Sequence, residues 1–246
     1  WLAALEARHL SDLRVQEITR ALRALSSAYV QRRSQAIGRS LDSAGKRAAF
    51  ALFYAPLHLL TTDRVVRALG ADAAPPRSIL DVGCGTGVAG AAWALAAGGT
   101  PRVTGIDRHP WAVEEARWTY RKLRIEGRAR AGDLVRLPPV APGAAVVAAY
   151  VLNELPPVTR ELLASRLIDA AGRGAKIMII EPIARSIAPW WDAMTSRIVA
   201  AGGRADEWRF PVDLPAPLRV FDRAAGLDHR ELTARSLYCP GAGSQP

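Results

Sequence analysis

The fold of this chain is decided by the stretch Ile79-Leu80-Asp81-Val82-Gly83-Cys84-Gly85-Thr86-Gly87. Its first residues predict a buried strand that ends around the acidic Asp81, and the glycines predict a turn. Residues 88–97 predict a helix directly after that turn. Glycines let backbone N–H groups approach a ligand, and the helix N-terminus faces it. This order of strand, turn and helix is typical of the nucleotide-type cofactor sites of doubly wound α/β folds.

Two cofactor patterns overlap in this stretch. Residues 85–90 fit G-x-G-x-x-G, the dinucleotide fingerprint. In a dinucleotide site, however, the first glycine directly follows the strand, whereas here Asp81 and Gly83 come first and Asp81 would place a negative charge beside a pyrophosphate. The D-x-G-x-G-x-G form instead resembles motif I of class I S-adenosylmethionine-dependent methyltransferases. Nicotinamide or flavin binding, and a turn without a ligand, stay open as alternatives.

This resemblance implies a set of cofactor-binding residues and extends over roughly residues 76–181. In motif I they are Asp81, Gly83, Cys84 (through its backbone only), Gly85, Thr86 and Gly87. A second short strand, residues 102–107, ends at Asp107, whose carboxylate can accept hydrogen bonds from both ribose hydroxyls. Both cofactor patterns predict this acid. Arg108 follows it directly, and we expect it at the same site.

A weaker strand over residues 128–131 leads to Asp133 and Leu134. In the methyltransferase family an acid at this place commonly meets the adenine amino group, so both residues are predicted to bind the cofactor. Gly132-Asp133 is also an ordinary turn dipeptide, and that alternative stays open.

The unbroken apolar run of residues 144–151 predicts a central parallel strand buried on both faces. Ligands of open α/β sheets bind beyond the carboxyl ends of such strands. Tyr150 is therefore predicted to contact the cofactor, and Asn153 and Glu154 to meet the acceptor. Asn153 could accept a hydrogen bond from an exocyclic amine, and Glu154 could orient it or take a proton. A turn residue and a solvated loop acid are the alternatives. Glu181, after the strand of residues 176–180, could line the acceptor pocket.

These elements predict a doubly wound, mostly parallel, seven-stranded α/β sheet of the Rossmann-like class I methyltransferase type with an N-terminal helical extension. We expect a basic helical extension over residues 1–75, the S-adenosylmethionine-binding domain over 76–240 and a flexible tail over 241–246. Within the extension, one helix is predicted over residues 47–60 with an interruption near Pro56, and another with Thr62 as N-cap up to Gly70. Residues 229–238 predict a closing antiparallel strand.

Composition narrows the class of protein. The chain of 246 residues is 50% hydrophobic, enough for a full core, and no apolar stretch reaches the roughly 18–20 residues that span a bilayer. The two cysteines, Cys84 and Cys239, are too few for a disulfide framework or a cysteine metal site, and the four histidines have no metal-ligand spacing. We therefore predict no metal, no membrane partner and a cytoplasmic location.

The charge suggests a polyanionic partner. The net charge is +10, with thirty arginines and three lysines, and residues 1–70 hold eleven basic and five acidic side chains. Such a basic lobe favours RNA as a partner, although a solvated helix face that keeps the protein soluble stays an alternative.

A closer resemblance lies in three short strings: F-Y-A-P-L-H at residues 53–58, Y-V-L-N-E-L at 150–155 and I-I-E-P at 179–182. They are similar to the small-ribosomal-subunit (mitochondrial-type) methyltransferase-like family, which implies rRNA or the ribosomal subunit as acceptor or partner. Members of that branch often carry a cysteine cluster for an iron–sulfur centre in the C-terminal half. This chain has only Cys239 there, so no cluster is predicted.

Together these features predict an S-adenosylmethionine-dependent methyltransferase that acts on RNA, with rRNA as a candidate acceptor. The N-P-P-Y signature of many adenine and cytosine N-methyltransferases is absent. Two alternatives stay open: a small-molecule acceptor, and a non-catalytic ribosome-assembly factor that keeps the cofactor-binding fold.

Overall fold

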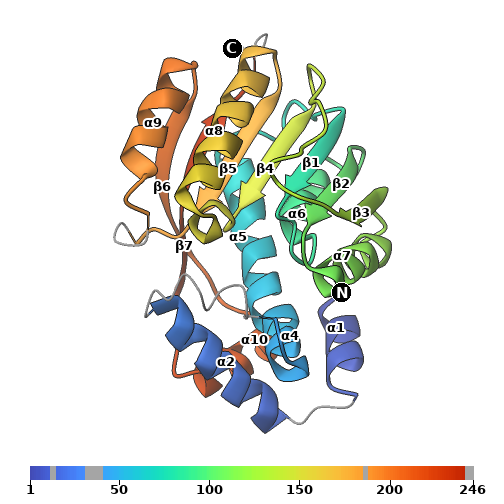
Figure 1. Ribbon diagram of the computed structural model, residues 1–246. Helices are drawn as coiled ribbons and strands as arrows, with labels where there is room; N and C mark the ends of the chain where they lie inside the picture. Colours follow the sequence, from blue (N-terminus) through green and yellow to red (C-terminus); the bar gives the residue numbers. More distant parts are fainter. Residues whose placement is uncertain (12–14, 31–40, 185–187, 242–246) are drawn as a thin grey trace. The chain divides into compact units, whose positions relative to one another are not determined.

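Seven strands form one mostly parallel sheet in the computed structural model, which describes residues 1–11, 15–30, 41–184 and 188–241 (Figure 1). The strand order is β3-β2-β1-β4-β5-β7-β6. Neighbouring strands from β3 to β5 pair in parallel, and β7 pairs antiparallel with β5. The predicted doubly wound class I fold and its closing antiparallel strand are confirmed. The strands are β1 (Ser78–Val82), β2 (Arg102–Asp107), β3 (Gly127–Ala131), β4 (Ala145–Ala149), β5 (Lys176–Glu181), β6 (Arg204–Pro211) and β7 (Glu231–Cys239).

Helices pack on both faces of the sheet, as the apolar runs of β1, β4 and β5 require. On one face, Leu80, Ile106 and Val146 share a buried cluster with Leu163 of α8 and Met194 of α9. The helices of the sheet region are α5 (Ala55–Ala68), α6 (Val88–Ala96), α7 (Pro110–Lys122), η2 (Leu152–Glu154), α8 (Pro157–Gly172) and α9 (Trp191–Ala200). Helices α6 and α7 cover the other face and pack closely on β2. A Cβ on Gly90 of α6 would lie 2.8 Å from Val103 Cγ1, and a Cβ on Gly105 of β2 would lie 2.8 Å from the Tyr120 hydroxyl of α7.

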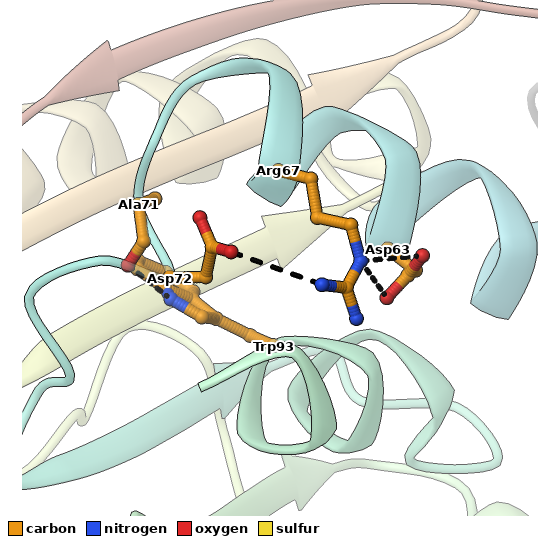
Figure 2. Close-up of polar contacts among 5 residues, drawn as sticks. All are labelled: Asp63, Arg67, Ala71, Asp72 and Trp93. Carbon is orange, nitrogen blue, oxygen red and sulfur yellow. Dashed lines mark hydrogen bonds and ion pairs between the residues drawn. The ribbon is translucent and has the colours of Figure 1, made fainter. Parts of the chain in front are cut away.

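Polar contacts fix the segment that leads from α5 into the sheet (Figure 2). Arg67 in the last turn of α5 forms ion pairs with Asp63, at 3.0 Å, and with Asp72, at 3.8 Å. The Trp93 indole N–H of α6 donates to the Ala71 carbonyl at 3.3 Å. The connection before β1 is thus tied to both neighbouring helices.

The predicted break between two helices near Thr62 is wrong. Residues 44–68 instead run through α4 (Ala44–Ala49), the π-helix η1 (Phe50–Tyr54) and α5 without a gap. Pro56 has no N–H for the preceding turn, and a wider π-turn directly before it accommodates this loss. Thr62 lies inside α5 with its hydroxyl buried, so it caps nothing.

Internal contacts divide the chain into two compact units. One comprises residues 1–58 and 210–232, with α1 (Leu2–His9), α2 (Val15–Val30), α4, η1 and α10 (Ala216–Ala224). The other comprises residues 59–209 and 233–246 and contains every residue predicted for the cofactor site. The N-terminal helices are therefore present, while the domain boundary after residue 75 stays a prediction. Residues 12–14 and 31–40, which carry part of the N-terminal basic charge, and 242–246 of the predicted tail lie outside the described residues.

The strand order sets the place of the candidate site. β1 lies between β2 and β4, so the chain reverses its direction of winding at β1. Ligands of open α/β sheets bind at the carboxyl ends of strands next to such a point. The carboxyl ends of β1, β2 and β4 therefore frame the candidate site.

Candidate active site

The glycine turn after β1 is held against the end of β2. The N–H groups of Gly83 and Cys84 both donate to the Ile106 carbonyl, at 2.9 and 3.0 Å. The Gly85 N–H donates to Oδ2 of Asp107 at 2.9 Å. The structure thus joins the two strongest sequence signals, the glycine turn and the acid after β2. The N–H groups of Gly83, Cys84 and Gly85 are therefore already hydrogen-bonded within the protein.

Cys84 contributes its backbone to this turn while its thiol is buried. Burial raises the pKa of the Cys84 thiol well above its usual range, with the charges of Asp81 and Asp107 adding to the effect. The thiol therefore stays neutral and is no nucleophile. That only the Cys84 backbone matters for the cofactor stays a prediction.

Helix α6 begins where two glycines permit close approach. Gly87 is the N-cap in the left-handed conformation, with φ +79°, and a Cβ there would lie 2.8 Å from the Tyr120 ring. The Gly90 N–H donates to Oδ2 of Asp81 at 2.8 Å. Because Gly87 offers no side-chain oxygen, Asp81 satisfies one of the free N–H groups at the helix start from the neighbouring strand.

Asp81 is almost wholly buried, which sets its protonation. Burial raises the pKa of Asp81 from 3.8 to about 7; the Gly90 hydrogen bond lowers it and the charge of Asp107 raises it. One oxygen of Asp81 caps α6. A contact with the cofactor, which the motif I resemblance implies for Asp81, is left to the other oxygen.

Asp107 anchors the end of β2. Its Oδ2 accepts from Gly85, and its Oδ1 accepts from the His109 N–H at 2.8 Å. A carboxylate oxygen has room for a second donor, so both oxygens can still accept from a ribose diol. The hydrogen bonds to two flanking segments hold the Asp107 carboxylate in a fixed orientation.

The residues predicted for the nucleoside side of the site lie after β2 and β3. Arg108 is exposed directly after Asp107. Asp133 is exposed after β3, and its Oδ1 accepts from the Val135 N–H at 3.0 Å, an Asx turn. Leu134 packs against the core cluster. The ordinary-turn interpretation of Asp133 therefore holds, and one of its oxygens carries no bond within the described residues.

Tyr150 follows β4 with a strained backbone. Its φ of +59° lies in the left-handed region, which a residue with a Cβ rarely adopts. The Tyr150 N–H donates to the Ile180 carbonyl at 2.8 Å, which fixes it beside the end of β5. Burial raises the pKa of the Tyr150 phenol above its usual range, and a hydrogen bond with Thr61 opposes that rise. The ring is thus held neutral.

A directed chain of hydrogen bonds lies beyond β4 and β5. Oε1 of Glu181 accepts from the N–H groups of Leu152, at 2.9 Å, and Asn153, at 3.3 Å. Oε2 of Glu181 accepts from the Asn153 amide nitrogen at 2.6 Å, and Asn153 Oδ1 accepts from the Trp190 indole N–H at 3.0 Å. Arg160 lies over the Trp190 ring, 5.3 Å from its centroid.

This chain brings Asn153 and Glu181 together, as their positions after adjacent strands predict. It also involves Trp190 and Arg160, which sequence reasoning missed as members of the site. Both ends of the Asn153 amide are engaged, so Asn153 is a rigid member of the site with one free lone pair on Oδ1. The tryptophan arrives 37 residues later in the chain. No local spacing could therefore have found the contact.

Glu154 is the second residue predicted to meet the acceptor. Burial raises its pKa from 4.5 to about 8; the charge of Asp107 adds to that rise and Arg108 opposes it. The influence of Asp107 and Arg108 shows that Glu154 shares their surroundings. At neutral pH its carboxyl group is protonated and can donate a hydrogen bond; when ionised it can accept a proton.

Four acids thus form a row across the carboxyl ends of β1, β2, β4 and β5: Asp81, Asp107, Glu154 and Glu181. The charge of Asp107 raises the pKa of Asp81 and of Glu154, and the charge of Glu154 raises that of Glu181. Burial is the main cause of the rise at Glu181, from 4.5 to about 8, while hydrogen bonds from the Asn153 and Leu152 backbone lower it. A positively charged ligand bound beside these acids would favour their ionised forms.

Unpartnered polar atoms fit a ligand at this edge. The buried Thr86 hydroxyl in the glycine turn and the buried Nδ1 of His109 have no hydrogen-bond partner among the described residues. Buried polar groups are rarely left unsatisfied. Together with the acceptor capacity of Asp107, they suit a ligand that carries hydroxyl and amino groups.

A cavity of about 290 Å³ between residues 137–140 and α8 is a separate feature, because none of the predicted site residues lines it. Among the described residues no group of three or more histidine, cysteine or acidic side chains could hold a metal ion. Across the part of the chain that the structure describes, no helix is long and apolar enough to cross a membrane.

Comparison with known proteins agrees with this geometry. The family described as "Methyltransferase domain" matches residues 79–170, which run from β1 into α8 and include the glycine turn, Asp107 and Asn153. Residues 79–170 are a class I S-adenosylmethionine-dependent methyltransferase domain. The methyltransferase is accordingly an enzyme, and its cofactor is S-adenosylmethionine.

Solved structures share the fold of the methyltransferase. The N-methyltransferase NodS from Bradyrhizobium japonicum WM9, with S-adenosyl-L-homocysteine, is 13% identical with a TM-score of 0.51, over 73% of this chain and 85% of that one. The methyltransferase domain of bacterial CtHen1-C is 13% identical with a TM-score of 0.50, over 75% and 97%. The magnesium protoporphyrin IX methyltransferase from Synechocystis PCC 6803 is 19% identical with a TM-score of 0.49, over 74% and 78%. No curated protein matches the chain.

Proposed function

We propose that the methyltransferase transfers the methyl group of S-adenosylmethionine to RNA, with rRNA as the leading acceptor. The observation that carries this proposal is the net charge of +10, from thirty arginines and three lysines against twenty-three acids. An excess of arginine suits phosphate binding, because the guanidinium group contacts phosphate oxygens in pairs. The similarity of residues 150–155 and 179–182 to the ribosomal branch supports the same acceptor. The cytoplasmic location stays a prediction.

On the cofactor side, we assign the ribose hydroxyls to Asp107 and the adenine amino group to Asp133. Gly83, Cys84, Gly85, Thr86 and Gly87 would form the floor beneath the methionine part. S-adenosylmethionine, when bound, supplies an activated methyl group on a positively charged sulfur. The row of acids would favour that charge over the neutral sulfur of S-adenosylhomocysteine.

On the acceptor side, we assign positioning to Asn153 and proton handling to Glu154. The Asn153 amide is clamped between Glu181 and Trp190, which supports a fixed place for the acceptor nitrogen or oxygen. Glu154 can donate a hydrogen bond when protonated and take a proton when ionised. Methyl transfer from a sulfonium needs alignment and exclusion of water more than a strong base.

The test is transfer of tritiated methyl from S-adenosylmethionine to purified small-subunit rRNA and to intact small subunits. Native protein is compared with Asp107→Ala, and with Asp169→Ala as a control that removes an exposed acid of α8. We expect label on RNA with the native chain and the control, and at least a tenfold loss with Asp107→Ala. Cofactor binding without label on either RNA substrate would favour the assembly factor or a small-molecule acceptor, and would overturn the proposal.

A further inference from the structure

An exposed basic surface belongs to the methyltransferase unit itself, whereas the sequence assigns the RNA contact to the N-terminal helices. Among residues 121–130 there are five basic side chains and one acidic one. All five are exposed, and they run from the last turn of α7 through the following turn along β3. We call them the β3 arginine surface: Arg121, Lys122, Arg124, Arg128 and Arg130.

The strand arrangement explains why this surface is open. β3 is an edge strand of the sheet (Figure 1). Arg128 and Arg130 pair in register with Thr104 and Ile106, so they lie on the face that α8 covers nearer the centre of the sheet. The connection from β3 to β4, residues 132–144, contains turns and no helix, and the two arginines stay uncovered.

The guanidinium charges of this surface are not paired within the described residues. Glu126, the acid of the segment, forms its ion pair with Arg102 of β2 at 2.6 Å. No carboxylate of the described residues lies within ion-pair distance of Arg121, Arg124 or Arg130. Arg128 Nε donates to the Thr104 hydroxyl at 3.4 Å, its one polar side-chain contact within the described part of the chain. The net positive charge of the surface is therefore available to a partner.

Arg124 supplies a second, independent observation. Its φ is +55°, and apart from Tyr150 every other described residue with positive φ is a glycine. The N–H of Ile125 donates to the Tyr120 carbonyl at 2.9 Å, so Arg124 occupies the helix-ending position at which glycine is usual. Among the described residues, no hydrogen bond or ion pair of the exposed Arg124 side chain offsets this strain. Strain of this kind is kept where a function requires the side chain.

We propose that the β3 arginine surface binds backbone phosphates of the RNA acceptor. This inference rests on the proposed RNA function and adds the place of contact. Arg128 and Arg130 are two residues apart on one face of a strand, about 6.6 Å, a spacing comparable to that of successive phosphates. β3 leads directly to Asp133 at the cofactor edge. RNA held along the strand would therefore extend toward the site of methyl transfer.

The test measures RNA affinity by fluorescence anisotropy with a fluorescein-labelled 20-nucleotide oligouridylate and with small-subunit rRNA as competitor. The surface variant is Arg124→Gly with Arg128→Gln and Arg130→Gln. Its matched control, Arg64→Gln with Arg166→Gln and Arg173→Gln, removes three exposed arginines elsewhere on the same unit. We expect at least a tenfold loss of affinity for the surface variant at 100 mM KCl, and less than threefold for the control. The slope of log affinity against log salt should fall by about 2, since each lost contact to a single strand removes roughly 0.7.

Arg124→Gly alone separates binding from folding. Glycine relieves the left-handed strain, so we expect the Tm to stay unchanged or to rise by about 2 °C, while RNA affinity falls by about threefold or more. If the multiple variant fails to fold, ultraviolet cross-linking of RNA to the native chain replaces it. Cross-linked peptides are then expected from residues 117–136.

The outcomes distinguish this surface from the proposed function. No salt-dependent RNA binding by the native chain would overturn both. Native binding with equal losses in the two multiple variants, or cross-links only elsewhere, would overturn the surface alone. Unchanged RNA affinity together with lost binding to phosphatidylserine vesicles would assign the surface to a membrane instead. Unchanged RNA affinity with aggregation of the surface variant would make the arginines edge protection of β3.

Discussion

Substitution of the two carbonyl-bearing side chains in the Glu181–Asn153–Trp190 chain tests the geometry of the candidate site. The indole N–H of Trp190 can only donate, and both oxygens of Glu181 accept hydrogen bonds in the structure, so the Asn153 amide has one workable orientation between them. Glu181→Gln places a second NH₂ group against that of Asn153. If Asn153 flips, its NH₂ group meets the Trp190 N–H instead. Either way one buried donor loses its acceptor.

The magnitude follows from that mismatch. A buried donor without an acceptor costs about 1–3 kcal/mol. In Glu181→Gln the remaining side-chain oxygen keeps the hydrogen bonds from Leu152 and Asn153 that Oε1 accepts at 2.9 and 3.3 Å. Asn153→Asp alone sets two carboxyl groups against each other where the native nitrogen and oxygen are 2.6 Å apart. Its cost should exceed roughly 2 kcal/mol at pH 8.

The double variant, Glu181→Gln with Asn153→Asp, restores the order of donors and acceptors. The carboxylate introduced at position 153 accepts both from the Trp190 N–H and from the amide introduced at position 181. We expect the double variant to recover about 2 kcal/mol relative to the sum of the single variants.

The assay is thermal unfolding of the four proteins at pH 8, followed by circular dichroism and calorimetry. With about 2–4 °C per kcal/mol for a chain of this size, the recovery of about 2 kcal/mol should place the Tm of the double variant several degrees above the value expected from the two single variants. The donor and acceptor order is refuted if the double variant shows no recovery of stability relative to the sum of the two single variants. A double variant less stable than both single variants refutes it equally.

Three further predictions concern the same unit. Asp107→Ala should weaken S-adenosylmethionine binding in calorimetric titration at least tenfold, about 1.4 kcal/mol; unchanged affinity contradicts the ribose assignment. The pKa values of Asp81 and Glu181 rise on folding, from 3.8 to about 7 and from 4.5 to about 8, because burial disfavours their charge. The folded state therefore binds more protons than the unfolded state. The contribution of these two groups to the free energy of unfolding should be largest below about pH 4 and should decrease as the pH rises to about 8. A Tm that does not decline between pH 5.5 and 8 at constant ionic strength speaks against this. Gly90→Ala should cost about 1–3 kcal/mol, since its Cβ would lie 2.8 Å from Val103 Cγ1 and 2.9 Å from Asp81 Oδ2; denaturant unfolding measures it, and a neutral change would show that α6 can shift.

The sequence predicts the centre of the sheet well because burial on both faces leaves a clear pattern. β1, β4 and β5 are apolar runs that end at polar residues, and parallel strands bring their carboxyl ends to one edge. That rule alone places Asp107, Asn153 and Glu181 near one another. β6 is harder to predict because it is an edge strand with exposed charged residues on one side, and its letters R-A-D-E-W-R-F-P contain no apolar run.

The contacts within the site escape prediction for a different reason. Asp81 is recognised from its motif, yet its bond to the Gly90 N–H depends on how closely α6 packs on β1. Trp190 meets Asn153 only after the chain has passed through α8 and β5. The break predicted at Thr62 fails because a threonine hydroxyl is a capping signal only where the helix begins. The apolar contacts of α5 continue past it.

Backbone strain is the observation that sequence patterns cannot supply, and it selects two positions. Tyr150 and Arg124 alone among the described residues adopt left-handed conformations with a side chain present. Tyr150 follows the central strand at the candidate active site, where its N–H is fixed to Ile180. Arg124 follows the end of α7 on the β3 arginine surface, where no hydrogen bond or ion pair of its side chain within the described residues offsets the strain. Glycine occupies the other left-handed positions of the described residues. The presence of arginine at position 124 therefore points to a role of its side chain in binding a partner.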